Sequence, residues 1–239
     1  MKITSKTLSK RIQNNEPDKL FYACLIELEH ILDDLMTLNY ELQESNYNMT
    51  TSDSEEKFNR YDRLKDVLFD LTVIRLYQLF EIHSLLGKHM TKNKTKLLPI
   101  LKPQWKIILN EKNNITFWRN EIVAHSFKRA NDFQLYNELD PNYDKSITEI
   151  LKISRYAVIY LWSLRGNLHE EYELAWKIKD QKMSRLKYFD SATLLTKIIS
   201  SEKRYFDQTH VLLKKNNFLT VPFCGYDDWP MSSNLSNKS

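Results

Sequence analysis

Hydrophobic positions recur along this chain, among polar ones, at the spacing of amphipathic helices. Between residues 20 and 47, apolar side chains recur at roughly helical spacing among acids, which predicts a first long helix. These apolar positions are Leu20, Cys24, Ile31, Leu35, Leu38 and Leu42. A second long helix is predicted over residues 55–86. Its middle, residues 67–86, is almost wholly apolar, so we expect it to lie at the centre of a bundle, with Gly87 as its left-handed C-terminal cap.

The rest of the chain continues the helical pattern. Residues 97–101 and Pro103 precede a short helix predicted at 104–110, and a further helix is predicted at about 115–125. Ser146, with Glu149 three residues later, forms a capping-box pattern that predicts the start of a long helix reaching about Lys182. The predicted fold is therefore all-α: an N-terminal arm (1–16), a helical bundle (17–182), a helical C-terminal extension (183–225) and a disordered tail (226–239).

Composition supports this fold class. Only 3 of 239 residues are Gly and 6 are Pro, which is too few turn residues for a sheet-rich protein. No apolar run approaches the ~18 residues of a membrane span, and the first twenty residues contain no signal-peptide core. We therefore expect a protein that does not associate with membranes. Cys24 and Cys224 stand far apart without metal-ligand spacing, which favours the reducing cytoplasm as its location. The formal charge of +4 is compatible with nucleic-acid binding without indicating it.

The candidate chemistry is concentrated in residues 117–127, Phe-Trp-Arg-Asn-Glu-Ile-Val-Ala-His-Ser-Phe. Arg119 is followed directly by Asn120, and His125 stands six positions after the arginine. Histidine is the side chain whose ordinary pKa lies closest to neutrality, so His125 is the natural acid–base candidate. Arg119 is charged at any cellular pH and offers forked donors that match phosphate oxygens, and Asn120 adds neutral donor and acceptor groups.

This arginine-to-histidine spacing, with Asn after the arginine, resembles the R-x(4-6)-H signature of the HEPN superfamily, and most closely the abortive-infection AbiU kind. The resemblance implies a small all-helical domain that works as a metal-independent endoribonuclease without a cofactor. It further implies a toxin or antiviral effector that acts on RNA as a homodimer, with Arg119, His125 and Asn120 as catalytic residues. A neutralising antitoxin, such as a nucleotidyltransferase-like protein, is a possible partner. Some HEPN toxins carry a modified Tyr two residues after the histidine, where this chain has Phe127.

Helix geometry constrains how these residues could act together. Residues six apart lie about 120° from each other around a regular helix. The helix could end before His125, the two side chains could converge by their length, or a dimer cleft could gather them. Glu121 lies four positions before His125, on its face of the helix, and could orient the imidazole. Arg75 and Glu81 are charged residues on the apolar second helix, where they could support the motif from beneath or form an ordinary interhelical salt bridge.

Other interpretations of the sequence stay open. On an ordinary amphipathic helix, Arg119 would pair with a surface acid and His125 would bind a carbonyl. The chain would then be a non-catalytic helical module that binds protein, nucleotide or RNA and keeps the motif as a ligand site or a remnant. An RNA-binding bundle without cleavage is a further alternative. No metal site is expected, because His83 and His89 lack Cys or paired carboxylates at ligand spacing.

Overall fold

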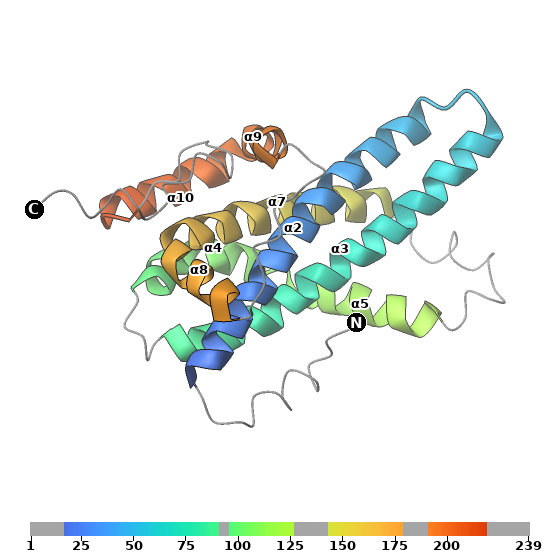
Figure 1. The fold of residues 1–239 in the computed structure, drawn as a ribbon. Helices are drawn as coiled ribbons and strands as arrows, with labels where there is room; N and C mark the ends of the chain where they lie inside the picture. Colours follow the sequence, from blue (N-terminus) through green and yellow to red (C-terminus); the bar gives the residue numbers. More distant parts are fainter. Residues whose placement is uncertain (1–16, 91–95, 127–142, 179–190, 219–239) are drawn as a thin grey trace, which may run out of the picture.

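The computed structural model describes residues 17–90, 96–126, 143–178 and 191–218, and within these ranges every regular element is an α-helix (Figure 1). The all-α prediction is therefore confirmed for the described residues. The helices are α2 (Pro17–Thr50), α3 (Glu55–Met90), α4 (Leu97–Leu109), α5 (Lys112–Ser126), α7 (Tyr143–Asn167), α8 (His169–Ile178), α9 (Ser191–Ser201) and α10 (Lys203–Lys215). The predicted arm (1–16) and tail (226–239) lie outside the described residues.

Helices α2 and α3 form a long antiparallel hairpin (Figure 1). They contain 34 and 36 residues, so each is about 50 Å long at the usual helical rise. Hydroxyl side chains close the end of α2, since Thr50 and Thr51 donate hydrogen bonds to the Tyr47 carbonyl at 2.8 and 3.0 Å. Glu55 and Glu56 occupy the first turn of α3, where negative charge favours the helix dipole.

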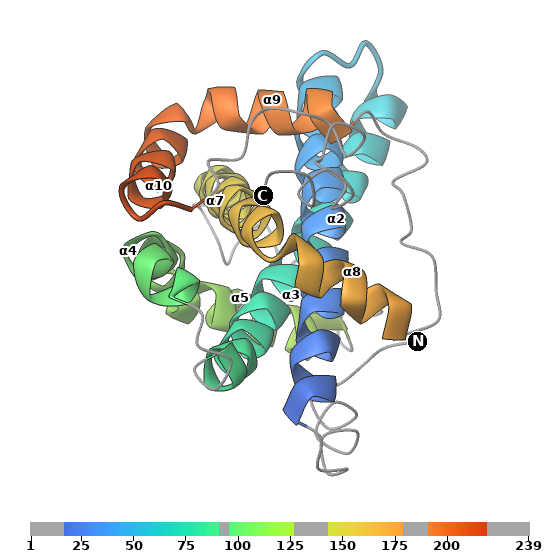
Figure 2. The ribbon, with the colours of Figure 1, turned by 60° about the vertical axis from the view of Figure 1, so that its left-hand side comes forward.

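Helix α7, rather than α3, is surrounded by the other helices. It contacts α2, α3, α4, α8, α9 and α10, and Figure 2 shows it nearly end-on among them. Its residues 157–166 are all buried, and Tyr160 is completely enclosed. The expectation that residues 67–86 lie at the centre of the bundle was wrong in part, because Val67 and Leu71 of α3 are 51% and 44% exposed.

Three helix boundaries also differ from the predicted ones. Gly87 does not cap α3, which continues to Met90 without a positive φ at this glycine. Pro103 lies inside α4, where only the hydrogen bond to the carbonyl of residue 99 is lost and buried Leu101 and Trp105 hold the helix against the core. Ser146 lies within α7 rather than before it, because the helix already begins at Tyr143.

The long helix predicted to reach Lys182 is interrupted at Leu168. Helix α7 ends at Asn167, whose side-chain Nδ2 donates a 2.9 Å hydrogen bond to the Ser163 carbonyl. Leu168 is buried, and α8 then turns to pack against α2. The break brings Trp176 of α8 to Glu29 of α2, a contact that a straight helix would not make.

A buried polar cluster ties α2, α7 and α8 together. Glu29 and Arg165 are 3% and 4% exposed, and both Nε and Nη2 of the arginine lie 3.0 Å from Glu29 Oε1. The second carboxylate oxygen of Glu29 accepts a 2.8 Å hydrogen bond from Trp176 Nε1. Because both charges are paired and hydrogen-bonded, the cluster avoids the cost of an isolated buried ion.

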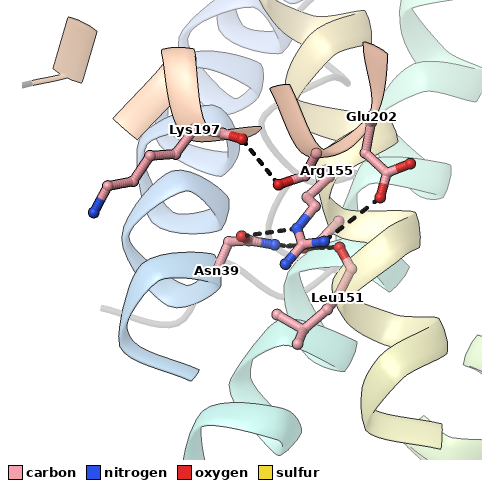
Figure 3. Close-up of polar contacts among 7 residues, drawn as sticks. Asn39, Leu151, Arg155, Lys197 and Glu202 are labelled. Carbon is pink, nitrogen blue, oxygen red and sulfur yellow. Dashed lines mark hydrogen bonds and ion pairs between the residues drawn. The ribbon is translucent and has the colours of Figure 1, made fainter. Parts of the chain in front are cut away.

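A second polar cluster joins the C-terminal helices to the bundle (Figure 3). Buried Asn39 of α2 donates hydrogen bonds to the Leu151 carbonyl at 3.2 Å and to Ser154 Oγ at 2.7 Å. Its Oδ1 accepts a 3.3 Å bond from Arg155, whose Nη1 lies 3.5 Å from the carboxylate of Glu202, between α9 and α10. The predicted helical extension thus contains α9 and α10, which pack on α2, α4 and α7.

None of the helices in the described ranges combines the length and hydropathy needed to cross a membrane.

Candidate active site on helix α5

The motif lies on one continuous helix. Helix α5 includes Arg119, Asn120 and His125 and ends at Ser126. The alternative that the helix ends before His125 is therefore excluded. At helical rise and twist, the Cα positions of Arg119 and His125 are about 9 Å apart along the axis and about 120° apart around it. The side chains of residues 121–126, including Glu121 and His125, lie outside the described part of the structure.

Helix α5 is held in place mainly by α3. Ile115 is completely buried, and the Trp118 ring packs edge-on against Phe69 of α3 with ring centroids 5.8 Å apart. Ile115, Trp118 and Arg119 follow the three-to-four-residue spacing of a single helix face. Phe117 stands outside this face and is 61% exposed. In Figure 1, α5 lies along α3 at the edge of the molecule, and its described residues Asn113, Asn114, Phe117 and Asn120 are exposed.

Arg119 lies over an aromatic ring rather than against an acid. Its guanidinium carbon is 4.8 Å from the centroid of Tyr77 on α3, and its Nη1 donates a 3.2 Å hydrogen bond to Asn120 Oδ1. Among the described residues, no carboxylate forms an ion pair with Arg119. Contact with a ring does not pair the guanidinium charge with an acid, so Arg119 and Asn120 together can present N–H groups to a phosphate.

The two supporting candidates on α3 have different surroundings. Arg75 forms an ion pair with Asp34 of α2 and donates a 2.7 Å hydrogen bond to Gln78, so it contributes the interhelical salt bridge considered from the sequence. Its contacts direct it toward α2 and not toward α5. Glu81 is half-buried and stands one helical turn after Tyr77, on the same side of α3.

The best-enclosed histidine of the described residues belongs to the core. His83 is 9% exposed, its ring stacks on Trp105 with centroids 3.6 Å apart, and its Nε2 lies 2.7 Å from the Tyr160 hydroxyl. Burial lowers the pKa of His83 to about 3 and raises the pKa of Tyr160 well above its ordinary value. Both groups are therefore neutral near pH 7, and their contacts with Trp105 join α3, α4 and α7.

A shallow groove of about 490 Å³ lies between α4 and α10, away from the motif. Its walls include Pro103, Ile107, Val211 and Leu212, with Asp207 at the edge. It contains no basic residue or histidine, so it offers no cation for phosphate binding. The amide and aromatic contacts of Arg119 are thus the arrangement with the clearest chemical use.

Sequence reasoning identified the motif but missed Tyr77, which supplies the ring beneath Arg119. Within the described residues, no three His, Cys, Asp or Glu side chains gather in a group that could hold a metal ion. Comparison of the chain with protein-family models, with curated proteins and with solved structures gives no match.

Proposed function

We propose that this chain is a metal-independent endoribonuclease of HEPN type that acts as a homodimer in the cytoplasm, as a toxin or antiviral effector of abortive infection. The observation that carries the proposal is the state of Arg119. It is supported by Tyr77 and Asn120, has no carboxylate partner among the described residues, and shares a continuous helix with His125.

In the proposed reaction, His125 takes the proton from a ribose 2′-OH. The 2′ oxygen then forms a bond to phosphorus while the bond from phosphorus to the 5′ oxygen breaks, and the leaving 5′ oxygen takes up a proton. Arg119 stabilises the additional negative charge on the phosphate oxygens, with the Asn120 amide beside it. The products are a 2′,3′-cyclic phosphate and a 5′-hydroxyl. DNA is not a substrate because it lacks the attacking hydroxyl.

The proposal includes a second copy of the chain. The positions of Arg119 and His125 diverge by about 120° around α5, so a single helix does not present both residues along one line. In a two-fold dimer, Arg119 of one subunit can act with His125 of the other, and two equivalent sites result. An antitoxin that covers this surface, such as a nucleotidyltransferase-like protein, fits the same proposal.

Cleavage assays in excess chelator test the proposed chemistry. His125→Ala should lower the cleavage rate by about 10²–10⁴ through loss of proton transfer. Arg119→Ala should lower it by a comparable factor, about 10²–10³, through loss of charge stabilisation. Exposed Arg204 of α10 provides the matched control, and Arg204→Ala should cleave like the parent. A substrate with one 2′-deoxy sugar at the cleaved position should stay intact.

Two results would overturn the assignment. Equal cleavage by the parent and both variants would place the chemistry elsewhere. A parent that leaves every RNA intact, together with variants that unfold, would make Arg119 and His125 structural and favour the non-catalytic binding module.

A further inference from the structure

The chain turns back at the end of α10. Asn217 has a φ of 59°, in the left-handed region that asparagine adopts more readily than most residues. Its N–H donates a 3.2 Å hydrogen bond to the Lys214 carbonyl, and the N–H of Phe218 donates a 3.0 Å bond to the Leu213 carbonyl. These two bonds form a Schellman motif, and Phe218 is partly buried against the core. The chain therefore leaves Phe218 beside α10, level with Leu213, rather than beyond its last turn.

The groove of about 490 Å³ between α4 and α10 runs beside the same turns of α10. Figure 2 shows the two helices side by side. Scattered exposed apolar residues are ordinary on protein surfaces. Here, however, they gather on both walls of one groove, with Ile107 of α4 37% exposed and Val211 of α10 64% exposed. The groove therefore offers an apolar surface to an occupant.

The sequence that follows Phe218 has the pattern of an extended apolar strip. Residues 219–223 read Leu-Thr-Val-Pro-Phe, so apolar side chains alternate with Thr220 and Pro222. Alternate residues of an extended chain point to the same side. Proline fixes its own φ in the extended range and disfavours the helical conformation for Val221 before it. An extended course for these five residues thus gives one side made of Leu219, Val221 and Phe223.

We propose that residues 219–223, which lie outside the described structure, occupy this groove as an extended segment antiparallel to α10, with their apolar side against its walls. An extended chain advances about 3.3 Å per residue and an α-helix about 1.5 Å, so each residue of the segment passes about two residues of α10. Counted from Phe218 beside Leu213, Leu219 comes level with Val211, and Val221 comes level with Asp207. These positions lie within the part of α10 that lines the groove.

Tethering and charge favour this segment over a separate partner. Because Leu219 follows Phe218 directly, the segment reaches the groove at an effective concentration of about mM, as short linkers give. Exposed cations stand beside the groove, next to Pro103 and Ile107 on α4 and one turn before Asp207 on α10: Lys102, Lys106, Lys203 and Arg204. The charged residues of 219–230 are Asp227 and Asp228 alone, so the sign of the segment is complementary to these cations.

The reactivity of a thiol in the groove tests the proposal in the full chain. Gln208→Cys places a thiol in the groove wall, and Cys224→Ser removes the thiol that follows the segment. Cys24 does not interfere, because it is 1% exposed and burial raises its pKa to about 12. Adding Val221→Asp should displace the segment and raise the rate at which N-ethylmaleimide labels the groove thiol by about tenfold, because a covered thiol reacts only while its cover is open.

Two controls isolate the contact. Thr220→Asp introduces the same charge one position earlier, on the other side of the extended segment, and should leave the labelling rate unchanged. Leu174→Cys with Cys224→Ser gives a reporter on α8, where Leu174 is 44% exposed. Val221→Asp should not alter the labelling rate of that thiol.

Four results would overturn the proposal. A groove thiol that is labelled equally fast with and without Val221→Asp would show that the segment does not cover it, as expected if the groove binds a different protein. Equal effects of Val221→Asp and Thr220→Asp would exclude the alternating contact. Protection that disappears as the protein is diluted would assign the groove to a second copy of the chain. A faster reaction of the α8 thiol with Val221→Asp would mean general unfolding instead of displacement.

Discussion

At the scale of single residues, the ring beneath Arg119 sets the position of the proposed catalytic cation. A cation over an aromatic face is attracted by the negative face of the ring, and the attraction does not occupy the edge donors of a guanidinium. In the proposed reaction, Tyr77, 4.8 Å from the guanidinium carbon, is therefore a positioning residue whose hydroxyl takes no part.

Two replacements of Tyr77 should separate the effect of its aromatic face from the effect of its hydroxyl. Tyr77→Leu removes the aromatic face and should lower kcat/KM for RNA cleavage by about two- to thirtyfold, the equivalent of a cation–π contact of ~0.5–2 kcal/mol. Tyr77→Phe keeps the face and should cleave like the parent. Steady-state kinetics of both variants check this, and equal losses in Leu and Phe variants would assign the effect to the hydroxyl instead.

His83 gives the fold a specific dependence on pH. Its pKa of about 3 in the folded protein lies below the ordinary value of 6.5, so the unfolded chain binds a proton between these values that the folded chain does not. The stabilising contribution is complete above about pH 6.5 and falls as the pH is lowered toward 3. His83→Gln cannot titrate but can still bond to the Tyr160 hydroxyl.

Denaturant unfolding between pH 6 and pH 4 checks this prediction. The free energy of unfolding of the parent should fall more steeply than that of His83→Gln, by up to about 1.4 kcal/mol per pH unit. The carboxylates titrate in both proteins and cancel in the comparison. Parallel curves would mean that His83 is protonated in the folded protein as easily as in the unfolded one.

Residue type and spacing single out the motif residues in the sequence, but they do not predict which side chains of other helices contact them. Arg119, Asn120 and His125 could be named because their chemistry depends on local order along one helix. Tyr77 lies 42 positions before Arg119 and carries no local signal, so only the packing of α5 on α3 identifies it. His83 similarly has no ligand spacing, and its stacking on Trp105 depends on how α3 and α4 meet.

At the scale of helices, buried ion pairs decide how segments distant in sequence dock. Glu29 and Arg165 are separated by 136 residues, and Trp176 adds the third helix through the other carboxylate oxygen. The net stability of such a pair is small, because desolvation opposes attraction. Its main consequence is that removing one partner leaves a charge that water cannot reach.

Arg165→Met should therefore destabilise the protein by about 3–5 kcal/mol, because it leaves the Glu29 carboxylate buried and unpaired. Adding Glu29→Gln should recover part of this loss, since the amide can still accept the Trp176 hydrogen bond without charge. Lys57→Met is the control: its pair with Asp53 is exposed, and the thermal midpoint should not move. A double variant less stable than Arg165→Met alone would contradict this account.

The positions of helices were predictable where the amphipathic pattern continues over many residues, but the ends of helices were not. The hairpin of α2 and α3 follows from apolar periodicity, and the gap between the two predicted helices, residues 48–54, encloses the observed turn. Gly87, Pro103 and Ser146 each carry an end signal that tertiary packing overrides, because buried neighbours hold the helix through the weak position. The break at Leu168 has no Gly or Pro at its position and depends on the contacts of α8 with α2.

At the scale of the whole molecule, the proposed function shares each site between two subunits. If Arg119 acts with His125 of the partner subunit, each of two inactive variants lacks a different half of every site. A heterodimer then contains one complete site, with Arg119 from the His125→Ala chain and His125 from the Arg119→Ala chain. If both residues of a site come from one chain, the heterodimer contains no complete site.

Mixing the two variants tests this arrangement. Equal amounts, allowed to exchange subunits at random, should give half heterodimers and so recover up to about one quarter of the parent cleavage rate. Differently tagged chains report the amount of heterodimer, and each variant alone should stay near background. Heterodimers without recovered cleavage would place both residues of a site in the same subunit.

The α2–α3 hairpin also bears on the order in which the chain folds. Its two helices are joined by residues 51–54, so their contacts close a short loop and can form early. Helix α5 needs only the adjoining α3 as its platform, whereas Asn39 must meet Leu151 across 112 residues and Tyr205 must meet the Gln104 carbonyl across 101. During synthesis, the scaffold of the motif can therefore assemble while the segment that completes the core is still being made.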